Sequence, residues 1–303
     1  MSKLLIVGAS GFFGRSIISF LSKNNKYNIR KVYFLCRKKI NCNLTKTRIG
    51  HIKKNIISLK KIPLVDNIIY CAKLKNEQND YWGLKNFLNL AFNTNKNSKF
   101  LYTSSGAVYG NINKILKTSE DYLLKNKFRK FNNKSKNLYA LTKIRNEKLV
   151  QSFGINKGMN VAIARCYAFT GIFLPLKKNY AVGNFVNSVL KKKNIIVKSQ
   201  IKTFRSYLHS DDLVKFLFKI LFKADKKCPI YNLGSDDPIS IEDLAIKLGN
   251  LYNIQVKRKN ISKVGVDYYV PNINKFKKDF KLKRKLNSFT AVLRMISDLK
   301  KLV

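Results

Sequence analysis

The sequence has few histidines, cysteines and acidic residues, and each shortage excludes a class of protein. His51 and His209 are the only histidines among 303 residues, so we expect no zinc site. The five cysteines are odd in number, irregularly spaced and without a C-x-x-C pair, which favours free thiols in a reducing compartment over a disulfide framework. No hydrophobic run reaches membrane-spanning length, and Met1 leads almost directly into an apolar run, so we expect no signal peptide, no membrane partner and a cytoplasmic location.

The shortage of acidic residues leaves a large positive charge. Asp and Glu total 16 against 61 Lys and Arg, which gives a formal net charge of +45. The basic residues extend from Lys3 to Lys301, with no zinc-finger spacing and no aromatic RNA-binding motif. Compositional bias therefore explains the charge better than a nucleic-acid partner, and a positive field would also attract an anionic substrate such as a nucleotide-diphosphate sugar.

Apolar runs of strand length alternate with helical patterns along the first half of the chain. Strands are expected at 4–7, 32–36, 67–71, 100–102 and 161–164, and helices at 11–23, 80–93 and 138–153. This alternation predicts an α/β fold, namely a Rossmann-type doubly wound parallel sheet with a smaller C-terminal α/β substrate lobe. We expect residues 1–170 to form the NAD(P)-binding domain, completed by segments near 205–235, and residues 171–303 to form mainly the substrate lobe.

A glycine-rich loop, Gly8-Ala-Ser-Gly-Phe-Phe-Gly14, follows the first expected strand and opens the first helix. Glycine permits a tight turn at Gly8, close approach of a pyrophosphate at Gly11 and close helix packing at Gly14. The helix N-terminus would add N–H groups and a positive dipole. The pattern indicates a dinucleotide-binding loop, although a glycine turn without a ligand shares it. The other loop residues expected at the cofactor are Ser10, Phe12 and Phe13.

The end of the second strand bears on the choice between the two nicotinamide cofactors. An acidic residue there binds the ribose hydroxyls of NAD, whereas a basic residue accommodates the 2′-phosphate of NADP. The segment Val32–Lys39 contains no carboxylate, and Arg37 is placed to pair with a phosphate. NADP is therefore favoured, and NAD stays open because basic residues occur throughout the chain.

Tyr139 and Lys143 are four residues apart in a helical pattern and so share one helix face. A free phenol titrates at about pH 10, and a neighbouring ammonium favours its ionised form. Such a pair can exchange a proton with a sugar hydroxyl, and Lys143 can hold the nicotinamide ribose. Ser105 ends an expected strand, where open α/β sheets bind ligands, so its hydroxyl is a candidate partner of the reacting oxygen. An ordinary helix-face pair and a Ser/Gly turn would give the same patterns.

Together these motifs resemble the extended short-chain dehydrogenase/reductase family, in its nucleotide-sugar epimerase/dehydratase branch. The resemblance covers nearly the whole chain, and its most specific parts are the G-x-x-G-x-x-G loop, the segment from Ser105 to Gly110 and the pair Tyr139 and Lys143. It implies that Ser105, Tyr139 and Lys143 are catalytic and that the cofactor is NADP or NAD. It also implies a homodimer through the helices near 80–93 and 138–153. Further contacts implied by the resemblance are cofactor contacts at Ala72, Asn79, Tyr139, Lys143 and Tyr167, and substrate contacts at Ser105, Gly106, Asn184 and the pyrophosphate-binding Arg205.

The sequence also departs from the family pattern. The family's dehydratases carry Asp-Glu directly after the catalytic Ser/Thr, where this chain has Gly106 and Ala107, so a dehydratase is disfavoured. Ala168 replaces a frequent asparagine, and no acidic residue ends the third strand, which is expected around Asn55–Leu59. Three functions remain open: a nucleotide-sugar epimerase acting by hydride transfer at the sugar C4, an NADPH-dependent 4-keto-6-deoxy nucleotide-sugar reductase and, more remotely, a non-catalytic dinucleotide- or RNA-binding protein.

Overall fold

The computed structural model describes residues 2–23, 26–38, 40–42, 44, 47–112, 114–177, 180–258, 265–282 and 286–302. The chain forms two compact units, each assembled from separate stretches of sequence. Unit 1 comprises Met1–Val108, Phe131–Cys166 and Val214–Tyr231, and unit 2 comprises Tyr109–Lys130, Tyr167–Leu213 and Asn232–Val303. All five cysteines are free, as the sequence predicts. No helix in the described ranges has the length and apolar character needed to cross a bilayer.

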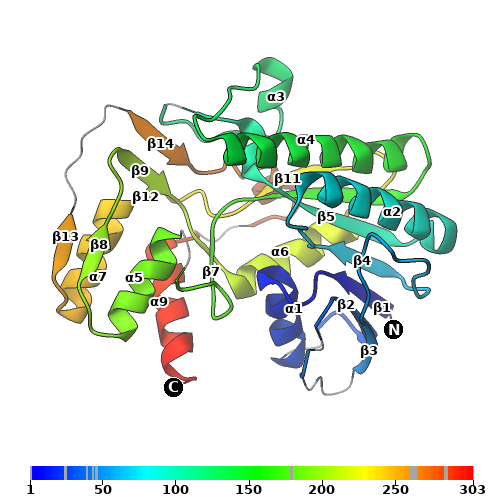
Figure 1. The fold of residues 1–303 in the computed structure, drawn as a ribbon, viewed down its shortest axis with the longest axis horizontal. Helices are drawn as coiled ribbons and strands as arrows, with labels where there is room; N and C mark the ends of the chain where they lie inside the picture. The colour runs from blue at the N-terminus through cyan, green and yellow to red at the C-terminus, as the bar shows by residue number, and fades with distance from the viewer. Residues whose placement is uncertain are drawn as a thin grey trace. The chain divides into compact units, whose positions relative to one another are not determined.

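The central sheet of unit 1 has seven strands in the order β11-β6-β5-β4-β1-β2-β3 (Figure 1). Neighbouring strands from β6 through β3 pair in parallel. This order confirms the predicted Rossmann-type sheet. The strands are β1 (Ser2–Val7), β2 (Ile29–Leu35), β3 (Arg48–Ile52), β4 (Asn67–Tyr70), β5 (Lys99–Ser105), β6 (Asn160–Cys166) and β11 (Ile230–Leu233).

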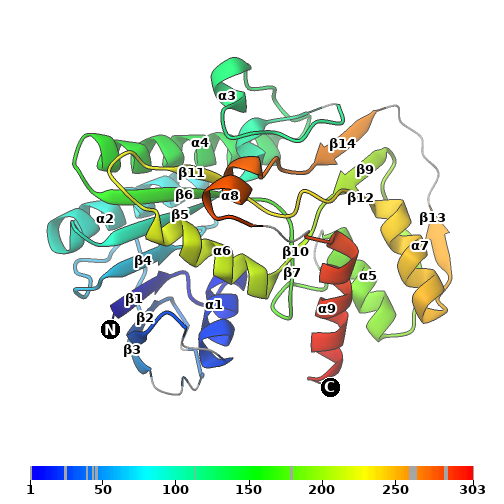
Figure 2. The same cartoon turned by 180° about the vertical axis from the view of Figure 1, so that it is seen from behind.

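Helices cover the sheet, which explains why its inner strands are continuously apolar. All four residues of β4 are buried, as expected for a parallel strand covered on both faces. Helices α2 (Glu77–Asn95) and α4 (Lys134–Ile155) run side by side over one face, and α1 (Phe12–Lys23) and α6 (Ser210–Phe222) lie over the other (Figures 1 and 2). The side chains of Asn76 and Asn133 cap the first turns of α2 and α4 by accepting backbone N–H groups.

The third strand lies earlier in the chain than predicted. We expected it around Asn55–Leu59, but β3 covers Arg48–Ile52. Among the described strands β3 pairs with β2 alone, and it is partly exposed. Its sequence therefore lacks the apolar run that marks an inner strand. The apolar residues that suggested a strand belong instead to a loop packed on α2, where Asn86 Nδ2 donates to the carbonyls of Ile56 and Leu59 at 3.0 Å each.

Unit 2 is built from small sheets and short helices. One sheet has the order β12-β9-β14, and β8 pairs with β13 and β7 with β10. Its helices α5, α7 and α9 share an apolar core that includes Phe185, Leu244 and Met295. Ser240 is the N-cap of α7, because its hydroxyl accepts the N–H of Asp243. The short helix η1 (Gly106–Tyr109) follows β5. The elements of unit 2 are α3 (Tyr122–Lys125), β7 (Phe169–Thr170), α5 (Ala181–Leu190), β8 (Ile195–Val197), β9 (Lys202–Arg205), β10 (Leu208–His209), β12 (Ile239–Ser240), α7 (Ile241–Tyr252), β13 (Val256–Arg258), β14 (Val266–Tyr269), α8 (Asn274–Asp279) and α9 (Ser288–Lys300).

Candidate functional site

The glycine loop joins β1 to α1 at the point where the sheet order reverses. Gly8 has a φ of +86°, and a Cβ atom there would lie 2.7 Å from both N and Cα of Ala72. A Cβ atom on Gly14 would lie 2.4 Å from Cα of Ala9, so α1 packs directly on the turn. Glycine is therefore required at Gly8 for both its backbone conformation and its proximity to the end of β4, and at Gly14 for helix packing.

The loop fits the phosphates of a dinucleotide. The strands β2 and β4 lie on either side of β1, and such reversal points bind ligands at the carboxyl ends of the strands. Ser10 and Gly11 are exposed there, and the fully described first turn of α1 has no acidic side chain to repel an anion. The rings of Phe12 and Phe13 are half-buried and meet edge to face at 5.6 Å.

Tyr139 and Lys143 extend from α4 toward the sheet. Lys143 is 3% exposed, and its Nζ lies 6.0 Å from the ring centroid of Tyr139, which is half-buried. The ammonium donates a hydrogen bond to the hydroxyl of Tyr102 at 2.9 Å. Lys73, which follows β4, places its ammonium 4.6 Å from the ring centroid of Tyr139. The Tyr139 ring thus lies near the ammonium groups of Lys73 and Lys143.

The sequence interpretation missed a buried group beside Lys143. Asp80 in the first turn of α2 is 2% exposed, and its Oδ2 lies 3.8 Å from Lys143 Nζ. Burial alone would lower the pKa of Lys143, but the Tyr102 and Tyr139 phenols and the Asp80 carboxylate outweigh it and hold that pKa above its ordinary value. Burial also raises the pKa of Tyr102 to about 12, although the ammonium opposes this shift.

Ser105 ends β5 at the same edge of the sheet. It is 7% exposed, and its Oγ accepts the N–H of Ala107 at 3.2 Å. The hydroxyl of the preceding Ser104 donates to Glu147 Oε1 at 2.5 Å. Arg165 Nη2 donates to Glu147 Oε2 at 2.8 Å. Glu147 thus connects α4, which carries Tyr139, to β5, which ends in Ser105, and its ion pair with Arg165 connects α4 to β6.

The remaining predicted residues divide between the two units. In unit 1, Ala72 contacts the glycine loop, Gly106 begins η1 and Arg37 is exposed after β2. Asn79 is exposed in the first turn of α2, beside the buried Asp80 that makes the contacts with Lys143. Unit 2 holds the other three predicted residues, which are Tyr167, Asn184 and Arg205.

In unit 2, Arg205 is paired with a carboxylate. Its Nη2 lies 2.7 Å from Asp267 Oδ2, and its Nη1 lies 3.2 Å from Asp267 Oδ1. The hydroxyl of Tyr167 forms a hydrogen bond of 2.6 Å with Thr118, and its ring centroid lies 4.6 Å from that of Tyr269. Asn184 is half-buried on α5. An anionic group that binds Arg205 would compete with Asp267 for the guanidinium.

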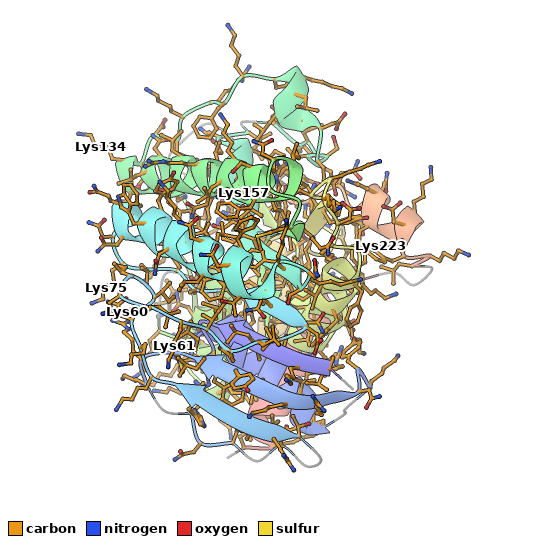
Figure 3. The ribbon with its side chains drawn as sticks, turned by 90° about the vertical axis from the view of Figure 1, so that its right-hand side faces the viewer. Lys60, Lys61, Lys75, Lys134, Lys157 and Lys223 are labelled. Carbon is orange, nitrogen blue, oxygen red and sulfur yellow. The ribbon has the colours of Figure 1, made fainter. Side chains whose placement is uncertain are left out.

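The positive charge of unit 1 is distributed over several of its segments. Exposed lysines project from the loops after β3 and β4, from both ends of α4 and from the end of α6 (Figure 3). Figure 3 labels Lys60, Lys61, Lys75, Lys134, Lys157 and Lys223. This distribution agrees with a composition-wide bias and provides a general positive field.

The fold, the glycine loop and the switch-point geometry define an α/β protein of the dinucleotide-binding class. Residues 4–234 match the model of the NAD dependent epimerase/dehydratase family. The chain belongs to this family of enzymes, which confirms the resemblance recognised in the sequence.

Individual relatives agree with the family assignment. A dTDP-D-glucose 4,6-dehydratase of Dictyostelium discoideum is 27% identical over 285 residues, covering 83% of this chain and 62% of that protein, so the chain spans less than two thirds of this relative.

Solved structures share the fold across almost all of this chain. The dTDP-glucose 4,6-dehydratase of Bacillus anthracis in complex with NAD has a TM-score of 0.78 at 15% identity, with 99% of this chain and 97% of that chain covered. A UDP-glucuronic acid 4-epimerase mutant of Bacillus cereus, in complex with UDP-4-deoxy-4-fluoro-glucuronic acid and NAD, has a TM-score of 0.77 at 17% identity, with coverage of 99% and 100%. At these identities the similarity establishes a shared fold.

Proposed function

We propose that the chain is a nucleotide-sugar epimerase-type oxidoreductase that acts at the sugar C4, with Ser105, Tyr139 and Lys143 as its catalytic residues. The observation that carries the proposal is the placement of Tyr139 near the Lys143 ammonium, on a helix packed against the strand that ends in Ser105. The proposed substrate is a nucleotide-diphosphate sugar, as in the UDP-4-deoxy-4-fluoro-glucuronic acid complex of the Bacillus cereus neighbour.

Each catalytic residue has a separate role in the proposed reaction. A nicotinamide bound at the glycine loop supplies hydride exchange with the sugar carbon. The Tyr139 hydroxyl exchanges a proton with the sugar hydroxyl, and the nearby ammonium of Lys143 stabilises the ionised phenol. The Ser105 hydroxyl binds the same sugar oxygen and stabilises its developing charge. Arg205 is the proposed diphosphate-binding residue, with the anion taking the place of Asp267 at the guanidinium.

A dehydratase is disfavoured by the residues after Ser105. Elimination of water requires an acid and a base at the sugar, which the family's dehydratases supply as Asp-Glu. Here η1 begins with Gly106 and Ala107, which have no ionisable side chains. The buried carboxylates on α2 and α4, Asp80 and Glu147, are paired with cations.

The alternative function is an NADPH-dependent reductase of a 4-keto-6-deoxy nucleotide sugar. The observation that favours it is Arg37, whose exposed side chain follows β2 where a 2′-phosphate would lie. The two functions differ in stoichiometry. An epimerase leaves nicotinamide absorbance unchanged over many turnovers, whereas a reductase consumes one NADPH for each product.

The test of the proposed function is turnover of a nucleotide-sugar panel by the unaltered protein and by Tyr139→Phe. Substrates and products are separated by chromatography and identified by mass spectrometry. We expect Tyr139→Phe to lower kcat by about 100-fold or more, because general acid–base catalysis contributes about that much. Tyr81→Phe, on α2, serves as the matched control and should leave kcat unchanged. Equal turnover by Tyr139→Phe and the unaltered protein would overturn the catalytic assignment.

A homodimer through α2 and α4 accompanies the proposal. These adjacent helices expose Trp82, Leu138 and Leu141 by 46%, 52% and 46%. Large apolar side chains exposed on neighbouring helices are suited to burial against a second copy. Sedimentation velocity would show a dimer for the unaltered protein and a monomer for Leu138→Lys/Leu141→Lys, and a monomeric unaltered protein would contradict the proposed dimer.

A further inference from the structure

A carboxylate is buried beside the ammonium of Lys143. Asp80 Oδ1 accepts the N–H of Leu74 at 2.8 Å. Its Oδ2 accepts Nδ2 of Asn146 at 3.1 Å and lies 3.8 Å from Lys143 Nζ. Asp80 thus accepts two hydrogen bonds, one through each oxygen, and lies within ion-pair distance of Lys143.

The contacts of Lys143 lie on the interior side of α4. Its Nζ donates to the Tyr102 hydroxyl at 2.9 Å, and Nδ2 of Asn146 donates to the same oxygen at 3.0 Å. The ring centroid of Tyr102 lies 4.9 Å from Nζ and that of Tyr139 lies 6.0 Å from it. Tyr102 thus binds the ammonium directly, Asp80 lies within ion-pair distance of it, and Asn146 bridges Tyr102 and Asp80.

The cluster is not optimised for stability. Tyr70 Oη and Asn146 Oδ1 are buried without a hydrogen-bond partner in the part of the chain that the structure describes. The Tyr70 ring centroid lies 6.0 Å from that of Tyr102, so both atoms border the cluster. Buried polar atoms without partners cost stability, and folded proteins retain few of them. Their presence beside a buried ion pair is typical of a functional site.

We propose that Asp80 is a positioning residue that anchors the Lys143 ammonium toward Tyr102 and partly cancels its positive field at Tyr139. This inference rests on the proposed function of Tyr139. Lys143 Nζ lies 3.8 Å from Asp80 Oδ2 and 6.0 Å from the ring centroid of Tyr139. The Asp80 carboxylate is therefore within about 10 Å of the Tyr139 ring. At an effective dielectric constant of about 20, a unit charge at that distance shifts a titration midpoint by about one pH unit.

Other groups that face the cluster contribute little charge at neutral pH. Burial raises the pKa of the Cys71 thiol to about 12 and also raises the pKa of Cys166, so both thiols remain neutral. Lys73 is the other cation at the Tyr139 ring. The titratable and charged groups are Asp80 from α2, Tyr70 from β4, Cys71 after β4, Tyr102 from β5, Tyr139 from α4 and Cys166 from β6.

The experiment titrates Tyr139 in the protein without substrate. Tyrosinate absorbance is followed against pH for each variant and for the same variant carrying Tyr139→Phe, and the difference isolates Tyr139. The variants are Asp80→Asn, the exchange Asp80→Asn/Asn146→Asp, which keeps one carboxylate and one amide in the cluster, and the control Glu77→Gln. Glu77 lies in the same first turn of α2, so Glu77→Gln removes an equal charge from the same helix.

We expect Asp80→Asn to lower the Tyr139 midpoint by about one pH unit, the exchange variant to recover most of that shift and Glu77→Gln to leave the midpoint unchanged. The kcat/KM profile should shift in the same direction without a change in dinucleotide affinity. An unshifted midpoint in Asp80→Asn would overturn the inference. If Asp80→Asn does not fold, Asn146→Asp decides, because it adds a carboxylate to the same cluster. A midpoint raised by about one pH unit supports the inference, and an unshifted midpoint contradicts it.

The two proposals fail separately in these measurements. Full turnover by Tyr139→Phe would disprove the proposed catalytic role of Tyr139. The absorbance titration would still show whether Asp80 affects the electrostatic field at Tyr139. If Tyr139→Phe loses activity as expected but the Tyr139 midpoint is unshifted in Asp80→Asn, only the proposed role of Asp80 is disproved.

Discussion

The glycine loop offers the sharpest test of the site, because two glycines of unit 1 share a positive φ but differ in their surroundings. Gly8 has a φ of +86° and Gly158 a φ of +74°. A Cβ atom at Gly8 would lie 2.7 Å from backbone atoms of Ala72, whereas at Gly158 the nearest atom is Lys226 Cε at 4.0 Å. Gly8→Ala and Gly158→Ala therefore carry the same backbone strain, and only the first carries a steric clash.

The magnitudes follow from these two effects. A left-handed conformation costs an L residue about 1–2 kcal/mol, and Gly158→Ala should lower the free energy of unfolding by about that amount. Overpacking costs about 1–3 kcal/mol more, and the Ala72 backbone cannot rotate away as a side chain can. Gly8→Ala should thus lower the free energy of unfolding by about 2–5 kcal/mol.

The assay is urea denaturation of both variants, followed by dinucleotide titration monitored by fluorescence. Relief of the clash must move the loop or the end of β4, so we expect Gly8→Ala to weaken dinucleotide binding about tenfold or more, which corresponds to about 1.4 kcal/mol. Gly158→Ala, remote from the loop in sequence, should bind normally. Equal destabilisation by the two variants, with unchanged dinucleotide affinity in Gly8→Ala, would refute the close packing of Gly8 on Ala72.

Three further predictions concern the cofactor, the substrate and pH. Arg37→Asp should weaken NADP binding about tenfold or more, because a charge-assisted hydrogen bond is lost. If the unaltered protein binds NAD more tightly than NADP, the preference for NADP is wrong. Asp267→Asn should tighten UDP binding about two- to fivefold by freeing the guanidinium, as measured by calorimetry, and Arg205→Ala in the same background should abolish the gain. The pKa values of Lys143 and Tyr102 are raised on folding, so the unfolded chain releases these protons first and stability falls as pH rises above about 10. Denaturation at about pH 9 and about pH 11 should show this loss, and Lys143→Met should reduce it.

Much of the first unit is predictable because its signals are local. The turn at Gly8, the helix packing at Gly14 and the spacing of Tyr139 and Lys143 depend on neighbouring residues, and the inner strands are marked by continuous apolar runs. The edge strand β3 was misplaced because an edge strand buries less of its surface and its partly polar sequence resembles a loop. The apolar residues after it pack on α2 through contacts that no local pattern reports.

The surroundings of the catalytic pair depend on contacts between distant residues. Asp80 and Asn146 are 66 residues apart and Lys143 and Tyr102 are 41 residues apart, so their hydrogen bonds form only when α2, α4 and β5 pack together. In the sequence, Asp80 looks like an ordinary acidic residue in the first turn of a helix, which the helix dipole favours. The pairing of Arg205 with Asp267 likewise requires β9 and β14 to lie side by side.

The sequence by itself determined the class of fold, the family and the identity of the candidate catalytic side chains, because strand and helix periodicity and short motifs are local properties of the chain. Tertiary structure alone decided which charges surround those side chains. Electrostatic interactions depend on distance in space and on burial, and neither can be read from separation along the chain.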